Sequence, residues 1–329
     1  PSSMGSCFIG GNIAENSGGA RAVKYGVTKD YVLNLEVVLP NGEIIWTGAN
    51  TLKNSTGYNL TQLMVGSEGT LGIVTKIVLK LWPKNNHNVL MLVPFYKSEQ
   101  ACEAVSAIFR AGIVPSALEF MERDALDWTM KFIDGVSVPI KDNIQAHLLI
   151  EVDGNYPEIL MQEAEQILNV VEQFEIDEVL FADTEEQKNA LWKMRRAVGE
   201  AVKSNSVYKE EDTVVPRYEL PKLLHGIKEI GKKYGFHSVC YGHAGDGNLH
   251  VNIIKGELSD EQWNTELPIA IRELFTEVIK LGGTISGEHG IGLVQKSYMD
   301  LAFPEVALNL MRNIKKVFDP KGILNPGKV

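Results

Sequence analysis

The sequence predicts an α+β fold, and two patterns along the chain indicate it. Residues 1–82 are rich in β-forming residues and glycine-containing turns, which favours sheet structure. From residue 88 to about 280, short β-rich runs alternate with longer segments of helical periodicity. Such alternation is typical of a sheet that helices cover on one side. The chain of 329 residues is also long enough for two compact units, each with its own core.

The first region contains a predicted β-hairpin and a further strand. Residues 30–39 and 44–47 are rich in β-forming residues, and the Asn-Gly step between them is a strong hairpin signal. A further strand is predicted over residues 73–81. Residues 82–86 then form a predicted linker, because proline and asparagine break the pattern.

The second region is predicted to alternate strands with helices. Its predicted strands are residues 89–95, 146–152, 179–182 and two within 238–254. Its predicted helices are residues 98–110, 157–174, 185–203, 221–234 and 260–281. Ser98 is the expected N-cap of the first of these helices, and Pro157 suits the first turn of the second. One more helix, residues 305–317, precedes a closing run of turn-forming residues.

The composition argues against several classes of function. The 32 basic and 42 acidic residues give a net charge of −10, which disfavours binding to nucleic acid or to an anionic membrane. Three scattered cysteines without a Cys-x-x-Cys spacing argue against a disulfide scaffold or a thiolate metal site, and favour a reducing, cytoplasmic setting. No apolar run approaches the roughly 20 residues of a transmembrane helix.

Two glycine-rich motifs stand out near the start of the chain. The chain opens with Pro1 and soon enters the first motif, so we expect a fragment of a longer protein. Residues 10–19 and 65–73 hold glycines at which backbone amides could closely approach a phosphate or a ring edge. Neither motif matches the phosphate loop or the Rossmann spacing, and a plain loop is the alternative interpretation of both.

Three of the seven histidines fall in two further glycine-rich segments. In the first, a Gly-Asp-Gly step at residues 245–247 can bend the chain so that His243 and His250 converge. In the second, Glu288 and His289 stand side by side between glycines. Two histidines and one carboxylate would leave coordination positions open, as catalytic metal sites do, for zinc, iron(II), manganese or cobalt. From the residues alone, ordinary hydrogen-bonded histidines beside a turn are an equal alternative.

Five motifs that occur in one order carry a family resemblance. They are residues 10–19, 65–73, 243–250, 288–289 and 325–328. Together they resemble the FAD-linked oxidases of the vanillyl-alcohol oxidase type. The most similar branch contains the glycolate oxidase D subunit, cytochrome-linked D-lactate dehydrogenase and D-2-hydroxyglutarate dehydrogenase.

The resemblance implies a domain organisation. Residues 1–82 match the second lobe of an FAD-binding domain, and residues 83–282 match a cap domain with an antiparallel sheet covered by helices. Residues 283–329 match a C-terminal return to the FAD domain. The family's first lobe, with its Pro-Gly-Gly-Thr-Gly pyrophosphate loop, has no counterpart in this sequence. We therefore expect an N-terminally truncated chain, and it stays open whether the isolated chain binds FAD or is active.

The resemblance also implies roles for individual residues. The metal ligands it implies, with zinc as the first choice, are His243, His250 and Glu288. His289 matches the catalytic base. Arg195 matches the arginine whose planar fork holds the substrate carboxylate, with Arg196 as the alternative, and Lys209 matches a further carboxylate contact. The residues expected to bind FAD are Gly10, Gly11, Asn12, Asn16, Gly18, Gly19, Gly66, Glu68, Gly69, Gly72, Ile73 and Asn325.

These matches predict FAD-dependent oxidation of a small D-2-hydroxy acid to the 2-oxo acid. Arg195 would hold the carboxylate, the metal would lower the pKa of the C2 hydroxyl, neutral His289 would accept its proton, and FAD would accept the hydride. Activity should therefore fall at acid pH. This chain has Gly199 one turn after Arg195, where D-2-hydroxyglutarate dehydrogenase has a threonine, so lactate or glycolate is favoured.

The prediction also covers the electron acceptor, the assembly and the location of the protein, and it leaves two other functions open. The electron acceptor would be a quinone, a cytochrome or an electron-transfer flavoprotein, and partner subunits or a homodimer are both open. The expected location is the cytoplasm, with peripheral association at the inner face of the membrane as the alternative. Two other functions also stay open: a metal-dependent hydrolase that needs no flavin, and a non-catalytic subunit or truncated remnant.

Overall fold

The chain folds as two compact units. The computed structural model describes residues 3–134, 138 and 140–328, so Pro1, on which the expectation of a fragment rests, lies outside the described residues. The first unit comprises Pro1–Gly19, Gly26–Lys84 and Ile285–Val329, and the second comprises Ala20–Tyr25 and Asn85–Thr284. Ala20–Tyr25 thus belongs to the second unit, although its sequence neighbours on both sides belong to the first. None of the described helices combines the length and the hydrophobicity that a bilayer crossing needs.

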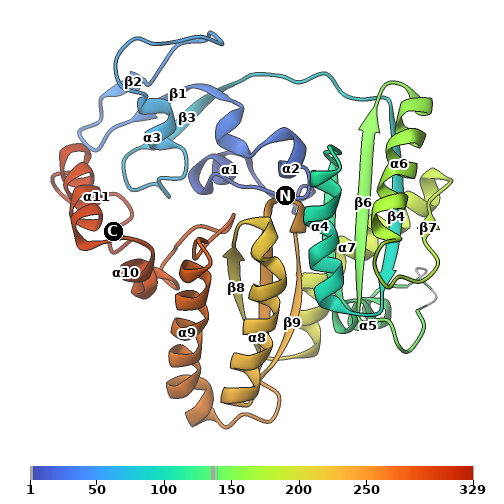
Figure 1. Cartoon of the computed structure of the whole chain (residues 1–329). Coiled ribbons are helices and arrows are strands. Elements are labelled where there is room, and N and C mark those ends of the chain that lie inside the picture. Colours follow the sequence, from blue (N-terminus) through green and yellow to red (C-terminus); the bar gives the residue numbers. More distant parts are fainter. Residues whose placement is uncertain (1–2, 135–137, 139, 329) are drawn as a thin grey trace. The chain divides into compact units, whose positions relative to one another are not determined.

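The first unit is built on a small antiparallel sheet in the order β2-β1-β3 (Figure 1). Its strands are β1 (Val32–Val38), β2 (Ile44–Trp46) and β3 (Ile73–Leu79). Val37 pairs with Ile45 across the hairpin, whose turn contains Gly42 at a φ of +87°. Glycine adopts this positive φ without steric cost, and the hairpin predicted from the Asn-Gly step is confirmed.

Helices of the first unit pack with this sheet into one core. The helices of this unit are α1 (Ile9–Glu15), α3 (Leu60–Met64), α10 (Met299–Ala302) and α11 (Glu305–Phe318), with 3-10 turns at Thr28–Asp30 and Lys296–Tyr298. The core of the unit joins Ile13 of α1, Leu35 of β1 and Met64 of α3 with Ile314 of α11. The C-terminal segment therefore packs onto the N-terminal region.

The glycine motif at residues 10–19 differs from the expected turn, because its first half is helical. Helix α1 runs through Gly10 and Gly11 to Glu15 and ends at Asn16, which has a left-handed backbone at a φ of +54°. The Asn16 N–H donates to the carbonyls of Asn12 and Ile13. Ile13 is fully buried, and this packing outweighs the low helix propensity of glycine.

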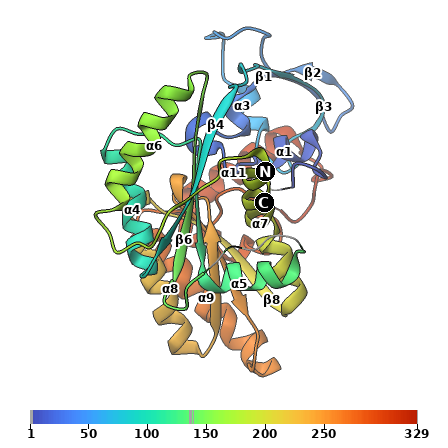
Figure 2. The same ribbon diagram turned by 90° about the vertical axis from the view of Figure 1, so that its right-hand side faces the viewer.

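The second unit is a seven-stranded antiparallel sheet with the order β7-β4-β6-β5-β9-β10-β8 (Figures 1 and 2). Its strands are β4 (His87–Phe95), β5 (Ala117–Glu122), β6 (Ala146–Gly154), β7 (Leu180–Phe181), β8 (Tyr208–Val214), β9 (His237–Gly242) and β10 (Asn248–Ile254). The antiparallel cap-type sheet is confirmed. Strands β5 and β8 were not predicted: β5 is buried along its whole length without alternation, and β8 is rich in charged residues.

Helices lie on both faces of this sheet, so the prediction that one side alone is covered is wrong. The helices are α2 (Ala22–Tyr25), α4 (Ser98–Arg110), α5 (Arg123–Phe132), α6 (Pro157–Val171), α7 (Glu185–Asn205), α8 (Leu220–Tyr234) and α9 (Leu267–Lys280). Helices α5 and α7 pack on one face, against Leu92, Leu149 and Val239. Helices α4, α6, α8 and α9 pack against one another on the opposite face (Figures 1 and 2). The apolar residues of the central strands are buried on both faces, which requires two helical layers.

The expected cap of α4 is also wrong. Ser98 is the first helical residue, and the N-cap position belongs to Lys97, which has an extended backbone and makes no capping hydrogen bond. The Ser98 hydroxyl donates instead to the carbonyl of Gln145 at 3.4 Å. The hydroxyl that was expected to cap the helix therefore bonds to the backbone of a neighbouring loop.

Candidate functional site

The β9–β10 hairpin brings two histidines together. Tyr241 of β9 pairs with His250 of β10, and His243 begins the 3-10 turn Ala244–Asp246 that joins the strands. The imidazole centroids of His243 and His250 lie 5.6 Å apart, and both residues are buried. Gly247 allows the bend, because it has a φ of +84° and a Cβ there would lie 1.9 Å from the carbonyl oxygen of Val215. The convergence expected from the Gly-Asp-Gly step is therefore present.

Glu119 of β5 fixes the orientation of His243. Both of its carboxylate oxygens lie 2.8 Å from Nδ1 of His243, and Glu119 is 1% exposed. A carboxylate can only accept here, so Nδ1 of neutral His243 carries the proton and Nε2 keeps its lone pair. A carboxylate behind an imidazole is the arrangement that orients histidine ligands toward metals. The sequence signal for Glu119 was an acidic residue inside an apolar strand, which we did not recognise because β5 itself was missed.

The same carboxylate holds Arg195 of α7. Nη2 of Arg195 lies 2.6 Å from Oε2 of Glu119, and its guanidinium stacks 5.1 Å from the ring centre of Tyr241. Arg195 is 3% exposed, whereas the alternative, Arg196, is exposed on the helix surface. Burial, and then the charge of Glu210, raise the pKa of the Tyr241 hydroxyl, which therefore stays protonated. The guanidinium of Arg195 and the imidazole of His243 therefore both contact the buried carboxylate of Glu119.

Strand β8 places acidic side chains beside His250, whereas the side chain of Lys209 points away from them. Nδ1 of His250 lies 3.6 Å from Glu210 and 3.8 Å from Asp212. Side chains alternate along a strand, so Lys209 points to the opposite face of the sheet. Its Nζ lies 5.6 Å from the ring centre of Trp263. The structure therefore does not bring Lys209 to the residues with which the sequence grouped it.

Glu288 and His289 belong to the first unit, in the loop that follows Ile285. They lie 3.9 Å apart, between Oε1 of Glu288 and Nε2 of His289. The loop rests on Gly18, since a Cβ there would lie 3.2 Å from Oε2 of Glu288. Gly290 has a φ of +77°, and a Cβ there would lie 2.1 Å from Glu15. The positive φ and the close approach of Glu15 explain why glycine occupies position 290, and Gly18 leaves room for the Glu288 side chain.

Glu68 also shapes this loop. Its carboxylate accepts hydrogen bonds from the N–H groups of Ile291 at 2.8 Å and Gly292 at 3.0 Å, and from Lys328 at 2.5 Å. Its carbonyl accepts from Nδ2 of Asn325 at 2.5 Å. Glu68 and Asn325 were expected to bind FAD, and in this structure their polar groups connect the second glycine motif to the C-terminal return.

The remaining glycines expected near FAD fall into two classes. At Gly10, Gly11 and Gly69 an added Cβ would meet nothing within 4 Å, so a ring or phosphate could approach the backbone there. The open backbone at these positions suits contact with the ring or a phosphate of a flavin cofactor. At Gly72, in contrast, a Cβ would lie 2.3 Å from Cγ1 of Val37, which makes this glycine necessary for strand packing.

The other residues of the same expectation lie within the first unit. The side chain of Asn16 accepts a hydrogen bond from the N–H of Lys29 at 2.9 Å. Gly66 and Gly19 have φ values of +76° and +149°, which explains glycine at both positions. Asn12 and Gly18 are half-buried, and Ile73 at the start of β3 is exposed.

Comparisons with known proteins identify the family. The family described as FAD linked oxidases, C-terminal domain, matches residues 84–329, and an FAD binding domain matches residues 1–48. The chain therefore belongs to the FAD-linked oxidases, which are flavin-dependent oxidoreductases.

Individual proteins support this membership. The glycolate oxidase subunit GlcD of Bacillus subtilis is 40% identical over 100% of this chain and 69% of that protein. A D-lactate dehydrogenase of Anaerostipes hadrus is 39% identical over 98% of this chain and 68% of that protein. The 4-ethylphenol oxidase from Gulosibacter chungangensis, solved with isoeugenol, superimposes with a TM-score of 0.72 at 18% identity, covering 96% of this chain and 68% of that one. This last likeness supports the fold.

Proposed function

We propose that this protein oxidises a small D-2-hydroxy acid, with D-lactate or glycolate favoured, to the 2-oxo acid in an FAD-dependent reaction. The observation that carries the proposal is Arg195, a buried guanidinium on the same carboxylate as a histidine, in a member of the FAD-linked oxidases. A buried guanidinium suits the carboxylate of such a substrate. Two relatives that span nearly the whole chain are named for glycolate and D-lactate.

In this proposal the two units have different tasks. The first unit serves as the second FAD lobe with its C-terminal return, and the second unit serves as the substrate-binding cap. FAD supplies the hydride acceptor. The open backbone positions at Gly10, Gly11 and Gly69 support contact with it. The enzyme would act in the cytoplasm or at the inner face of the membrane, and would pass electrons to a quinone, a cytochrome or an electron-transfer flavoprotein.

We also propose that His243, His250 and Glu288 hold a divalent metal, with zinc favoured. The donor set fits, because two buried imidazoles converge and Glu119 directs Nε2 of His243 away from itself. Glu288 lies in the other unit, and its membership in the set is supported by the family resemblance. The cation supplies Lewis acidity that makes a nearby hydroxyl easier to deprotonate.

The chain's own residues then have distinct roles in the reaction. Arg195 binds and orients the substrate carboxylate through two parallel hydrogen bonds. The protonated Tyr241 beneath the guanidinium keeps it in place through its ring face. His289, in its neutral form, accepts the proton of the C2 hydroxyl as the C2 hydride leaves.

Gly199 supports a substrate without a second carboxylate. It lies one turn after Arg195, and a Cβ at this position would lie 3.2 Å from the hydroxyl of Tyr241. A polar side chain that could hold a distal carboxylate is therefore missing at this position.

We expect D-lactate and glycolate to be oxidised at least about 10-fold more efficiently than D-2-hydroxyglutarate, since one charge-assisted hydrogen bond contributes about 1.5–3 kcal/mol. Turnover of the flavin-loaded protein with each acid, and with L-lactate, tests this. Equal or better turnover of D-2-hydroxyglutarate would contradict the assignment.

Removal of the charge behind His243 should weaken metal binding. Replacing Glu119 by glutamine keeps a hydrogen-bond acceptor for Nδ1 but removes the charge that makes the imidazole more basic. We expect the zinc dissociation constant to rise by about 10- to 100-fold, which is usual for a carboxylate behind a ligand. Competition with a fluorescent chelator measures it. Glu122→Gln is the matched control, because Glu122 is a buried carboxylate of the same strand that contacts Lys228. If both variants bind zinc like the unaltered protein, Glu119 does not orient a ligand.

A further inference from the structure

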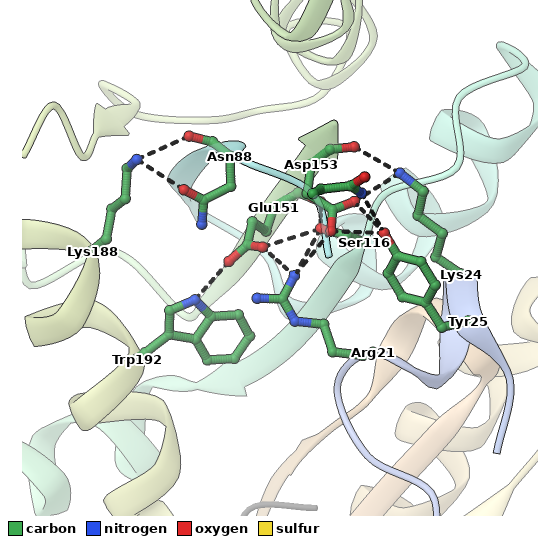
Figure 3. Close-up of polar contacts among 10 residues, drawn as sticks. Arg21, Lys24, Tyr25, Asn88, Ser116, Glu151, Asp153, Lys188 and Trp192 are labelled. Carbon is green, nitrogen blue, oxygen red and sulfur yellow. Dashed lines mark hydrogen bonds and ion pairs between the residues drawn. The ribbon is translucent and has the colours of Figure 1, made fainter. Parts of the chain in front are cut away.

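A second buried carboxylate, Glu151, lies in the middle of the cap sheet. Glu151 belongs to β6, which has strand neighbours on both sides, and it is 1% exposed. Oε1 contacts Nη1 of Arg21 and lies 3.2 Å from the hydroxyl of Ser116, and Oε2 accepts from Nε1 of Trp192 at 2.8 Å (Figure 3). Each oxygen thus has a defined donor, as a buried charge requires.

Glu151 and Glu119 hold the same helix. Glu119 pairs with Leu149 across the β5–β6 ladder, and Leu149 lies two residues before Glu151, so both carboxylates point to the same face. Trp192 and Arg195 are three residues apart on α7 and therefore neighbours on one helix face. Glu151 accepts from Trp192, and Glu119 binds Arg195. Helix α7 is thus held at two neighbouring residues, Trp192 and Arg195.

A further contact holds α7 one turn earlier. Nζ of Lys188 donates to the carbonyl and to the side-chain oxygen of Asn88, both at 2.9 Å (Figure 3). Lys188, Trp192 and Arg195 follow one another at four and three residues, which places them in one stripe along the helix. This stripe faces β4, β6 and β5 in turn, and a shift of α7 would break all three contacts.

The cation that neutralises Glu151 comes from the segment Ala20–Tyr25. Besides the Arg21 contact, Nζ of Lys24 donates to Oδ1 of Asp153 at 2.8 Å, and the hydroxyl of Tyr25 donates to the same carboxylate at 2.8 Å (Figure 3). The guanidinium of Arg21 also lies 5.5 Å from the ring centre of Trp192. This segment directly follows the glycine motif of the first unit in the sequence.

We propose that Glu151 is a positioning residue for the reaction: through Trp192 it fixes α7 so that Arg195 meets the substrate carboxylate. Arg21 pairs with Glu151, and the segment Ala20–Tyr25, which follows the glycine motif in the sequence, thereby contacts the residues that hold the substrate-binding helix. The role of Arg195 in binding the carboxylate rests on the proposed function. The expected displacement of Arg195 in a Trp192 variant does not depend on the proposed function.

Trp192→Phe tests this, because it keeps the ring and removes the indole donor to Glu151. The experiment measures the Nε–Hε cross-peak of Arg195 in the ¹⁵N spectrum, assigned with Arg195→Lys, the dissociation constant for D-lactate with zinc present, and the midpoint of thermal unfolding. Trp128→Phe is the matched control, since Trp128 of α5 packs against the same cluster of buried apolar residues as Trp192. We expect Trp192→Phe to move the Arg195 cross-peak and to raise the dissociation constant about 10-fold, a change of 1.4 kcal/mol. Trp128→Phe should leave both unchanged at a similar unfolding midpoint.

Arg21→Met tests the contact between Arg21 and Glu151 and also covers the case in which Trp192→Phe does not fold, because Arg21 is 46% exposed. It should move the Arg195 cross-peak in the same direction, and Arg21→Lys should restore it. An Arg195 cross-peak that stays in place in the folded Trp192 and Arg21 variants overturns the proposal, as does an equal displacement by Trp128→Phe. If the cross-peak moves as expected but the unaltered chain does not bind D-lactate, the positioning role stands and the proposed function falls.

Discussion

Replacing Arg195 by lysine is expected to lower kcat/KM for D-lactate by about 10³-fold in the flavin-loaded protein. Lysine keeps the positive charge beside Glu119, so the buried carboxylate retains a cation. It loses the planar fork that meets a carboxylate at two points, and with it the orientation of C2. The expected factor corresponds to about 4 kcal/mol, which combines the loss of a charge-assisted hydrogen bond with the loss of substrate orientation. Steady-state turnover across a range of D-lactate concentrations measures it.

The neighbouring arginine is the control for this prediction. Arg196 is exposed on the same helix, so Arg196→Lys makes the same chemical change away from Glu119. We expect kcat/KM to stay within a factor of about two, since an exposed arginine contributes little to stability or binding. A large loss in Arg196→Lys, with Arg195→Lys nearly unaltered, would reverse the assignment of the two residues.

His289→Ala is expected to lower kcat by about 10²- to 10⁴-fold, the usual range for the loss of a general base. Flavin and zinc contents should not change, because His289 is outside the proposed ligand set. His289 is 48% exposed, so added imidazole should reach the vacated position and restore part of the rate. The measurement is turnover with and without imidazole. Full turnover of the variant with flavin bound would exclude His289 as the base.

Local patterns predicted the parts of the fold that depend on local backbone preferences. The hairpin around Gly42 followed from its Asn-Gly step, and the convergence of His243 and His250 followed from the glycines between them. Both features depend on a few neighbouring residues with unusual φ angles. Most helices of the cap were also predicted within a few residues of their observed ends, because their apolar periodicity is strong.

Features that depend on tertiary contacts could not be predicted in this way. Strand β8 carries charged residues on both faces, and only Glu210 and Asp212 lie beside His250, which is visible only once the strands are paired. Glu119 was missed for the same reason, since its partners are distant in sequence. Gly10 and Gly11 are helical because Ile13 needs burial, and the alternation along β8 directs Lys209 away from Arg195.

The most direct test of the account is anaerobic bleaching of the flavin absorbance by D-lactate, before and after removal of bound metal with a chelator. We expect rapid bleaching with D-lactate or glycolate, slow bleaching with L-lactate, a loss of rate after chelation, and recovery when zinc is added back. Flavin that none of these acids reduces, or bleaching that chelation does not slow, would contradict the proposed metal-assisted oxidation of a D-2-hydroxy acid.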